Sequence, residues 1–192
     1  MRHIVHEVID PELWICWGAF AVVWTVGAVI ARRRPSAKGG RDFASLGAAV
    51  IALVAIKSPS SLWEFLTTGS TWPRLVGVAM LALATPVALW ARLELGTMWS
   101  SRTVVKQGHF LRTDGLYGFM RHPIYTALLG MVAGTALAEG LGRWVLIFVG
   151  VLLFVSLKIR AEERLLSQEF PDEYARYRRA VPRLLPRPWR HA

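Results

Sequence analysis

Cysteine is nearly absent from this sequence, which has one cysteine, Cys16, among 192 residues. An intrachain disulfide is therefore excluded, and there is no cysteine spacing that would indicate a metal site. Acidic residues are also scarce, with 13 Asp and Glu against 23 Lys and Arg, so that the formal net charge is +10. A glycine-rich phosphate-binding loop is missing as well, which argues against the common nucleotide-binding motifs.

Long hydrophobic stretches are what the sequence does have. Hydrophobic residues make up 54% of the chain, and 9 residues are tryptophan. Residues 13–31 carry no formal charge, and about 20 such residues are enough to cross the hydrocarbon core of a bilayer. The N-terminus lacks the positive start of a cleavable signal peptide. We therefore predict an integral membrane protein of the all-α class, with a single domain over residues 1–192.

Five apolar segments are the predicted transmembrane helices. They cover residues 13–31, 44–57, 75–91, 124–138 and 144–159. The segments 44–57 and 124–138 are shorter than the roughly 20 residues that a full crossing needs, so incomplete or re-entrant spans remain open for these two. The short connection 139–143 predicts an antiparallel helical hairpin.

The distribution of positive charge predicts the orientation. Of the 23 Lys and Arg, 19 lie in the segments 32–42, 92–123 and 158–192. The positive-inside rule places these segments in the cytoplasm and the N-terminus outside, either in a bacterial-type inner membrane or in the endoplasmic reticulum. Since membrane topology explains the basic charge, the expected partners are membrane lipids, and no nucleic-acid partner is expected.

The first long cytoplasmic segment, 92–123, ends in an Arg-His-Pro sequence. Extended pieces around residues 102–105 predict some strand pairing before it. Pro123 suits the first position of a helix, which places His122 near the N-cap, where backbone amides are free and the helix dipole is positive. With Arg121 this makes a seat for a carboxylate or phosphate. The alternative is a simple anchor at the membrane interface.

The second cytoplasmic segment, 158–192, contains adjacent glutamates. The fifth helix is expected to continue to about residue 170, with a short helix after Pro171 and residues 181–189 along the membrane surface. Glu162 and Glu163 point about 100° apart on a helix, so at most one is expected to aim into a site while the other pairs with Lys158 or Arg160. These carboxylates are suited to holding a cationic ligand or orienting an arginine; the alternative is a solvated helix end.

Three stretches carry a resemblance to a known family. They are "LGTMWS" (95–100), "KQGHFLRTDGLYGFMRHPIY" (106–125) and "RAEERLLSQEFPDEYARYRRAVPRLLP" (160–186). In these motifs the chain resembles the isoprenylcysteine carboxyl methyltransferases and the related phospholipid N-methyltransferases, over about residues 90–186. Leu116 stands where the family usually has proline, and Pro171 where it usually has glycine, which affects turn geometry more than chemistry.

The resemblance implies an S-adenosyl-L-methionine-dependent methyltransferase without a Rossmann domain. Its cofactor pocket would lie on the cytoplasmic side, closed by the C-terminal helical segment, and a lipophilic or lipidated substrate would enter from the bilayer. Arg121 and Glu163 are the predicted catalytic residues, with Arg121 orienting the acceptor. The predicted cofactor-binding residues are His109, Leu111, Gly115 and Tyr117 around the adenosine, His122 at the cofactor carboxylate, Glu162 or Glu163 at its amino group, and the nearby Tyr125.

The methyl acceptor stays open at this stage. An isoprenylcysteine carboxylate, a phospholipid amine or another lipid would each suit the resemblance. Two other functions also remain: an NADPH-dependent membrane sterol-type reductase and a non-catalytic lipid-binding membrane protein.

Overall fold

The computed structural model describes residues 2–31, 36–39, 53–55, 57–96, 104–106 and 111–186. Its helices are α1 (Arg2–Ala31), η1 (Ser60–Leu66, a 3₁₀ helix), α3 (Thr71–Leu95), α4 (Leu116–Phe119), α5 (Pro123–Ala138), α6 (Trp144–Glu169) and α7 (Pro171–Ala180). Two short strands, β1 (Ser36–Gly39) and β2 (Val104–Lys106), form an antiparallel ribbon. The predicted all-α class is confirmed, and the ribbon accounts for the extended pairing expected near residues 102–105.

Three of the helices are long and apolar enough to cross a membrane. Their candidate spans are Pro11–Ile30, Thr71–Leu95 and Trp144–Glu169, in agreement with the predicted segments 13–31, 75–91 and 144–159. Large apolar side chains on these helices are exposed, among them Trp14, Val22, Leu83, Trp90 and Leu153. Exposed apolar surface of this extent suits contact with lipid rather than water. The chain is an integral membrane protein.

The two short predicted spans have different outcomes. The segment 124–138 is the helix α5, which has 16 residues and is shorter than the other apolar helices. The segment 44–57 lies outside the described residues apart from 53–55 and 57, which are helical. The total of five spans therefore stays a prediction.

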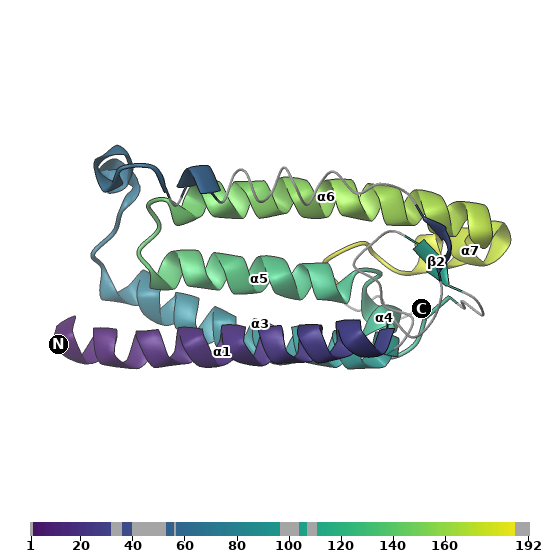
Figure 1. Ribbon diagram of the computed structural model, residues 1–192, viewed down its shortest axis with the longest axis horizontal. Coiled ribbons are helices and arrows are strands. Elements are labelled where there is room, and N and C mark those ends of the chain that lie inside the picture. The colour runs from purple at the N-terminus through teal and green to yellow at the C-terminus, as the bar shows by residue number, and fades with distance from the viewer. Residues whose placement is uncertain are drawn as a thin grey trace.

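Helix α5 is the centre of the bundle. It packs against α3 on one side and α6 on the other, while α1 packs against α3 (Figure 1). The α3–α5 contact depends on glycine, because a Cβ atom on Gly134 would lie 2.7 Å from the carbonyl oxygen of Gly77. Trp17 of α1 donates a hydrogen bond of 3.1 Å to Thr135 of α5. These neighbours cover a helix that is apolar on all sides, as such a helix requires.

A tight turn joins α5 to α6 and forms the predicted hairpin. Gly140, Leu141 and Gly142 all have positive φ, at 83°, 68° and 56°, a region that glycine enters at little cost. Thr68, in the connection between η1 and α3, donates its amide to Gly140 O at 2.9 Å and supports this turn. The hairpin returns the chain, so that the C-terminal ends of α3 and α6 lie with α4, α7 and the start of α5 at one end of the molecule (Figure 1). The described parts of segments 92–123 and 158–192 therefore meet there.

Candidate active site

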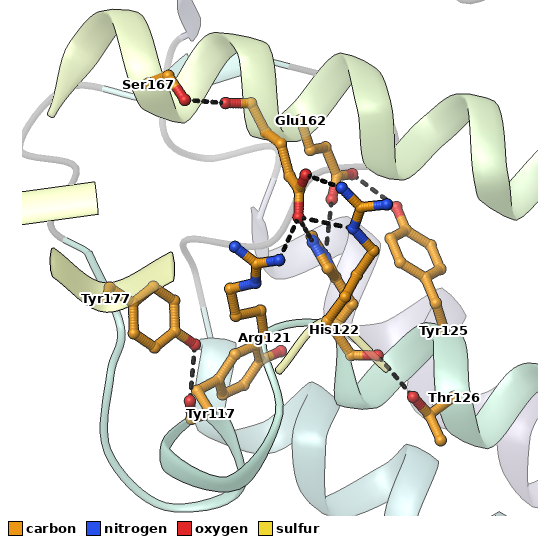
Figure 2. A network of polar contacts seen from close by, with 10 residues as sticks. Tyr117, Arg121, His122, Tyr125, Thr126, Glu162, Ser167 and Tyr177 are labelled. Atoms are coloured by element: carbon orange, nitrogen blue, oxygen red, sulfur yellow. Dashed lines mark hydrogen bonds and ion pairs between the residues drawn. The ribbon is translucent and has the colours of Figure 1, made fainter. Parts of the chain in front are cut away.

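Two parts of the sequence that are about 40 residues apart form one polar cluster at this end of the bundle. Pro123 is the first residue of α5 and His122 its N-cap, as the sequence predicted. Helix α6 continues past its apolar part as far as Glu169 and brings Glu162 and Glu163 beside His122. Figure 2 shows the side chains of the two segments pointing toward one another.

Glu163 is the hub of the cluster. Its Oε1 atom lies 3.1 Å from Nη2 of Arg121 and 3.4 Å from Nε2 of His122. Arg183 donates two further hydrogen bonds, from Nε to Oε1 at 3.1 Å and from Nη2 to Oε2 at 2.7 Å. The side chains of Glu163 and Arg121 are only 8% and 7% exposed. A buried charge needs such partners, and here one carboxylate accepts from three side chains.

Glu162 has a more open environment. Its Oε1 atom accepts a hydrogen bond of 2.6 Å from the hydroxyl of Tyr125 on α5, and its Oε2 atom lies 3.9 Å from Nδ1 of His122. The Glu162 side chain is 26% exposed. The imidazole of His122 therefore lies between the two carboxylates, and Glu162 is the carboxylate with the greater access to a ligand (Figure 2).

The segment after α7, residues 181–186, crosses the start of α5, and we call it the strap. The amides of Arg121 and His122 donate to the carbonyl oxygens of Pro182 and Arg183, at 2.9 Å and 3.1 Å. One helical turn further on, the hydroxyl of Thr126 donates to the carbonyl of Leu184 at 2.7 Å. The strap thus covers the entrance to α5 through backbone hydrogen bonds.

Tyrosines of α7 and α4 close the other side of the cluster. Tyr177 donates a hydrogen bond of 2.6 Å to the carbonyl oxygen of Tyr117, so that α7 is tied to α4. Burial and, after it, the charge of Glu163 raise the pKa of Tyr174 to about 12. Burial and then the charge of Glu162 raise the pKa of Tyr117 well above its usual range. Both phenols therefore stay protonated and neutral beside the carboxylates at neutral pH.

Arg121 has hydrogen-bonding capacity that the described part of the chain does not use. Its Nη2 atom is paired with Glu163, but its Nε and Nη1 atoms are buried without a hydrogen-bond partner among the described residues. An unpaired buried donor is costly and calls for an explanation. A bound anionic group would supply one, because a guanidinium binds a carboxylate through two parallel N–H donors.

Comparison with known proteins shows a similarity to one family. The sequence model of the isoprenylcysteine carboxyl methyltransferase (ICMT) family matches residues 75–168, which run from α3 through most of α6 and include the Arg-His-Pro and Glu-Glu sequences. Over these residues, which are just under half of the chain, the sequence is similar to the ICMT family. Over 79 residues, 41% of this chain, it is 39% identical to Protein-S-isoprenylcysteine O-methyltransferase of Schizosaccharomyces pombe. Over 82 residues, 42% of this chain, it is 37% identical to Methanethiol S-methyltransferase 1 of Bradyrhizobium diazoefficiens.

The matched stretches are only part of these two relatives. They cover 34% of the S. pombe protein and 27% of the B. diazoefficiens protein. The whole fold also has a solved counterpart, the eukaryotic intramembrane Ras methyltransferase ICMT, with a TM-score of 0.60 and 16% sequence identity. That likeness covers 94% of this chain and 69% of the solved chain, and it confirms the predicted ICMT membrane fold.

The structure brings most of the predicted site residues together. Those in the polar cluster are Arg121, His122, Tyr125, Glu162 and Glu163, with Tyr117 at its edge. Leu111 and Gly115 belong to the loop before α4, and no hydrogen bond or ion pair in the described part of the chain joins either of them to the cluster. His109 lies outside the described residues. The roles of all nine residues remain predictions.

One local expectation differs from the structure. The amide of His122, the N-cap of α5, donates to the carbonyl of Arg183 in the strap, so it is not free to hold an anion. Glu163 is the glutamate that aims into the cluster, and it pairs there with Arg121 and Arg183. These partners are distant in the sequence, so helical spacing did not indicate them. The position of residues 181–189 along the membrane surface stays a prediction, and 187–189 lie outside the described residues.

Two further residues near the site were missed. Arg183 was one cation among many in the segment 158–192. Glu94, near the end of α3, accepts a hydrogen bond of 3.0 Å from the amide of Leu116 and thereby caps α4. Gly115 permits this contact, since its φ is 56° and a Cβ atom there would collide with the Glu94 carboxylate. A glutamate directly before the "LGTMWS" stretch was the available signal.

Proposed function

We propose that the protein is a membrane methyltransferase that transfers a methyl group from S-adenosylmethionine to a lipophilic acceptor. The observation that carries the proposal is the polar cluster, in which the buried Arg121 has two donor atoms without a partner among the described residues and Glu162 offers a more accessible carboxylate. Similarity to the ICMT family supports the reaction type. The family matches give no support to a sterol-type reductase.

The polar cluster fits the cofactor. The amino-acid end of S-adenosylmethionine carries an ammonium and a carboxylate, and the cluster offers groups for both. Glu162, held by Tyr125 and His122, is the proposed partner of the ammonium. The imidazole of His122 is the proposed neighbour of the carboxylate, while His109, Leu111, Gly115 and Tyr117 are proposed to surround the adenosine. When bound, the cofactor supplies a methyl group already activated by a sulfonium.

The protein's own residues then have to position the acceptor and exclude water. We propose that the Nε and Nη1 donors of Arg121 orient the acceptor, which they do best for a carboxylate. A carboxylate acceptor needs no general base. An amine or thiol acceptor has to lose a proton, and Glu162 is the accessible carboxylate that can take it. Glu163 already accepts from three side chains, so we propose that it holds Arg121 and His122 in place.

The acceptor class follows from the membrane position of the site. One relative is named for an isoprenylcysteine O-methyl transfer and another for methylation of methanethiol, so the chemistry of the acceptor atom differs among related proteins. The exposed apolar faces of α1, α3 and α6 favour an acceptor that is dissolved in the bilayer. The concentration of 19 of the 23 Lys and Arg in three segments supports a cytoplasmic site and an external N-terminus.

The test uses purified protein in detergent or nanodiscs. Binding of S-adenosylmethionine and of NADPH is measured separately, and the protein is then incubated with labelled S-adenosylmethionine and either S-farnesyl cysteine or a lipid extract. We expect binding of S-adenosylmethionine and a labelled lipophilic product, which mass spectrometry identifies. Binding of NADPH without S-adenosylmethionine would favour the reductase, and binding of neither would favour a non-catalytic protein.

A further inference from the structure

Arg183 makes an unusual contact for a residue in an irregular segment. Its guanidinium binds Glu163 with two donors, Nε to Oε1 at 3.1 Å and Nη2 to Oε2 at 2.7 Å. The hydrogen bond to Glu163 raises the pKa of Arg183 further above its usual range. The side chain is 51% exposed, so it reaches from the surface to a buried carboxylate. The family match ends at residue 168, before the strap.

The same residue also takes part in docking of the strap. The backbone carbonyl of Arg183 accepts the amide of His122, and the carbonyl before it, from Pro182, accepts the amide of Arg121. Arg183 thus contacts the site twice, through its backbone at the start of α5 and through its side chain on α6. A contact of this kind closes a ring that links the strap, α5 and α6.

This ring restrains Arg121. The backbone of Arg121 is held by Pro182, and its Nη2 atom is held by Glu163. Two restraints on one arginine fix the direction in which its free Nε and Nη1 donors point. Both restraints are linked to Arg183, because its side chain joins the strap to the Glu163 carboxylate. A bidentate guanidinium–carboxylate pair is well suited to this because it fixes direction as well as distance.

We propose that Arg183 is a positioning residue, which latches the strap onto Glu163 and thereby orients Arg121 toward the methyl acceptor. The inference rests on the proposed function in naming the acceptor, but the latch itself is a property of the free protein. Loss of the latch should loosen the strap first. The efficiency of transfer to the acceptor should then fall more than the affinity for the cofactor, which is assigned to Glu162 and its neighbours.

Two variants and a control test the proposal. Arg183→Gln removes the charge, and Arg183→Lys keeps the charge without the two-donor fork. Arg179→Gln is the control, because Arg179 is an exposed residue of α7 outside the polar cluster. Hydrogen exchange of the Arg121 and His122 amides reports docking of the strap, because these amides donate to it. We expect about tenfold faster exchange in Arg183→Gln, the effect of losing one charge-assisted hydrogen bond at a half-exposed position. The control should match the unaltered protein.

Activity with S-farnesyl cysteine as the probe provides the second measurement. Arg183→Gln should lower kcat/KM for the probe about tenfold while the Kd for S-adenosylmethionine changes less than about threefold, and Arg183→Lys should recover part of the loss. Unchanged exchange in Arg183→Gln would overturn the latch. If Arg183→Gln lost transfer and cofactor affinity to the same extent, and Arg183→Lys recovered neither, Arg183 would have only a structural role and the proposed positioning role would be wrong. If the unaltered protein neither binds S-adenosylmethionine nor methylates the probe, the proposed function fails, and the exchange data still decide the latch.

Discussion

Replacing each of the two neighbouring glutamates by glutamine should have very different effects. Glu163 and its partner Arg121 are both more than nine-tenths buried. Removing one member of such a pair leaves the other charge buried and uncompensated, which costs about 3–5 kcal/mol. Glutamine keeps one acceptor oxygen in the same place, so Glu163→Gln should lie near the lower end, at about 3 kcal/mol.

Glu162→Gln is the matched control. The Glu162 side chain is 26% exposed, and glutamine can still accept the hydrogen bond from Tyr125. Its effect on the free energy of unfolding should stay below about 1 kcal/mol. The affinity for S-adenosylmethionine should nevertheless fall about tenfold or more, since the ammonium of the cofactor loses its charged partner.

Thermal unfolding in detergent, followed by the fluorescence of the nine tryptophans, measures the loss of stability in Glu163→Gln and Glu162→Gln. A loss of about 3 kcal/mol corresponds to a decrease in Tm of about 6–12 °C for a chain of this size, whereas Glu162→Gln should lower Tm by only a few degrees. Cofactor binding is measured on both variants below their transitions. If Glu163→Gln unfolded at the normal temperature but failed to bind the cofactor, Glu163 would contact the cofactor directly, and the structural role argued above would be refuted.

Helix packing and the tie between α7 and α4 give two further predictions. Gly134→Leu should prevent normal packing of α3 on α5, because its Cβ would meet backbone atoms that cannot move aside, and the folded fraction on size-exclusion chromatography should collapse. Gly18→Ala is its control, since nothing lies within 4 Å of the added Cβ atom. Tyr177→Phe removes the hydrogen bond to the carbonyl of Tyr117 and should lower the free energy of unfolding by about 1–2 kcal/mol, measured as a decrease in Tm; an unchanged Tm would contradict this.

The sequence predicted those parts of the fold that depend on local pattern. Uncharged stretches of sufficient length indicated α1, α3 and α6, and Pro123 indicated where α5 begins. The continuation of α6 beyond the apolar part was also expected from its helix-forming residues. These features follow from bilayer thickness and from the geometry of proline, and they need no knowledge of distant contacts.

The sequence indicated which motif residues form the site, but not which side chains pair with one another there. The motif residues Arg121, His122 and Glu163 do meet, but helical spacing gave no indication of Arg183 as a partner of Glu163. The Glu163 carboxylate is buried in the cluster, where Arg121 and Arg183 are close enough to compensate its charge. The docking of the strap depends on backbone carbonyls, which carry no residue-specific signal in a sequence.

The depth of the site follows from the lengths of α5 and α6. At 1.5 Å per residue, the 16 residues of α5 span about 24 Å. Glu163 lies 19 residues after Trp144, the first residue of α6, which places it about 28 Å from the turn between the helices. The hydrocarbon core is about 30 Å thick. If the turn lies at one membrane surface, the cluster lies near the opposite edge of the hydrocarbon, where the polar end of a lipid-like molecule would meet water. The two glutamates suit such a boundary. Glu163 is buried and its charge is compensated by three side chains, so it can stay charged beside lipid. Glu162 is more exposed, so it can reach a water-soluble ligand.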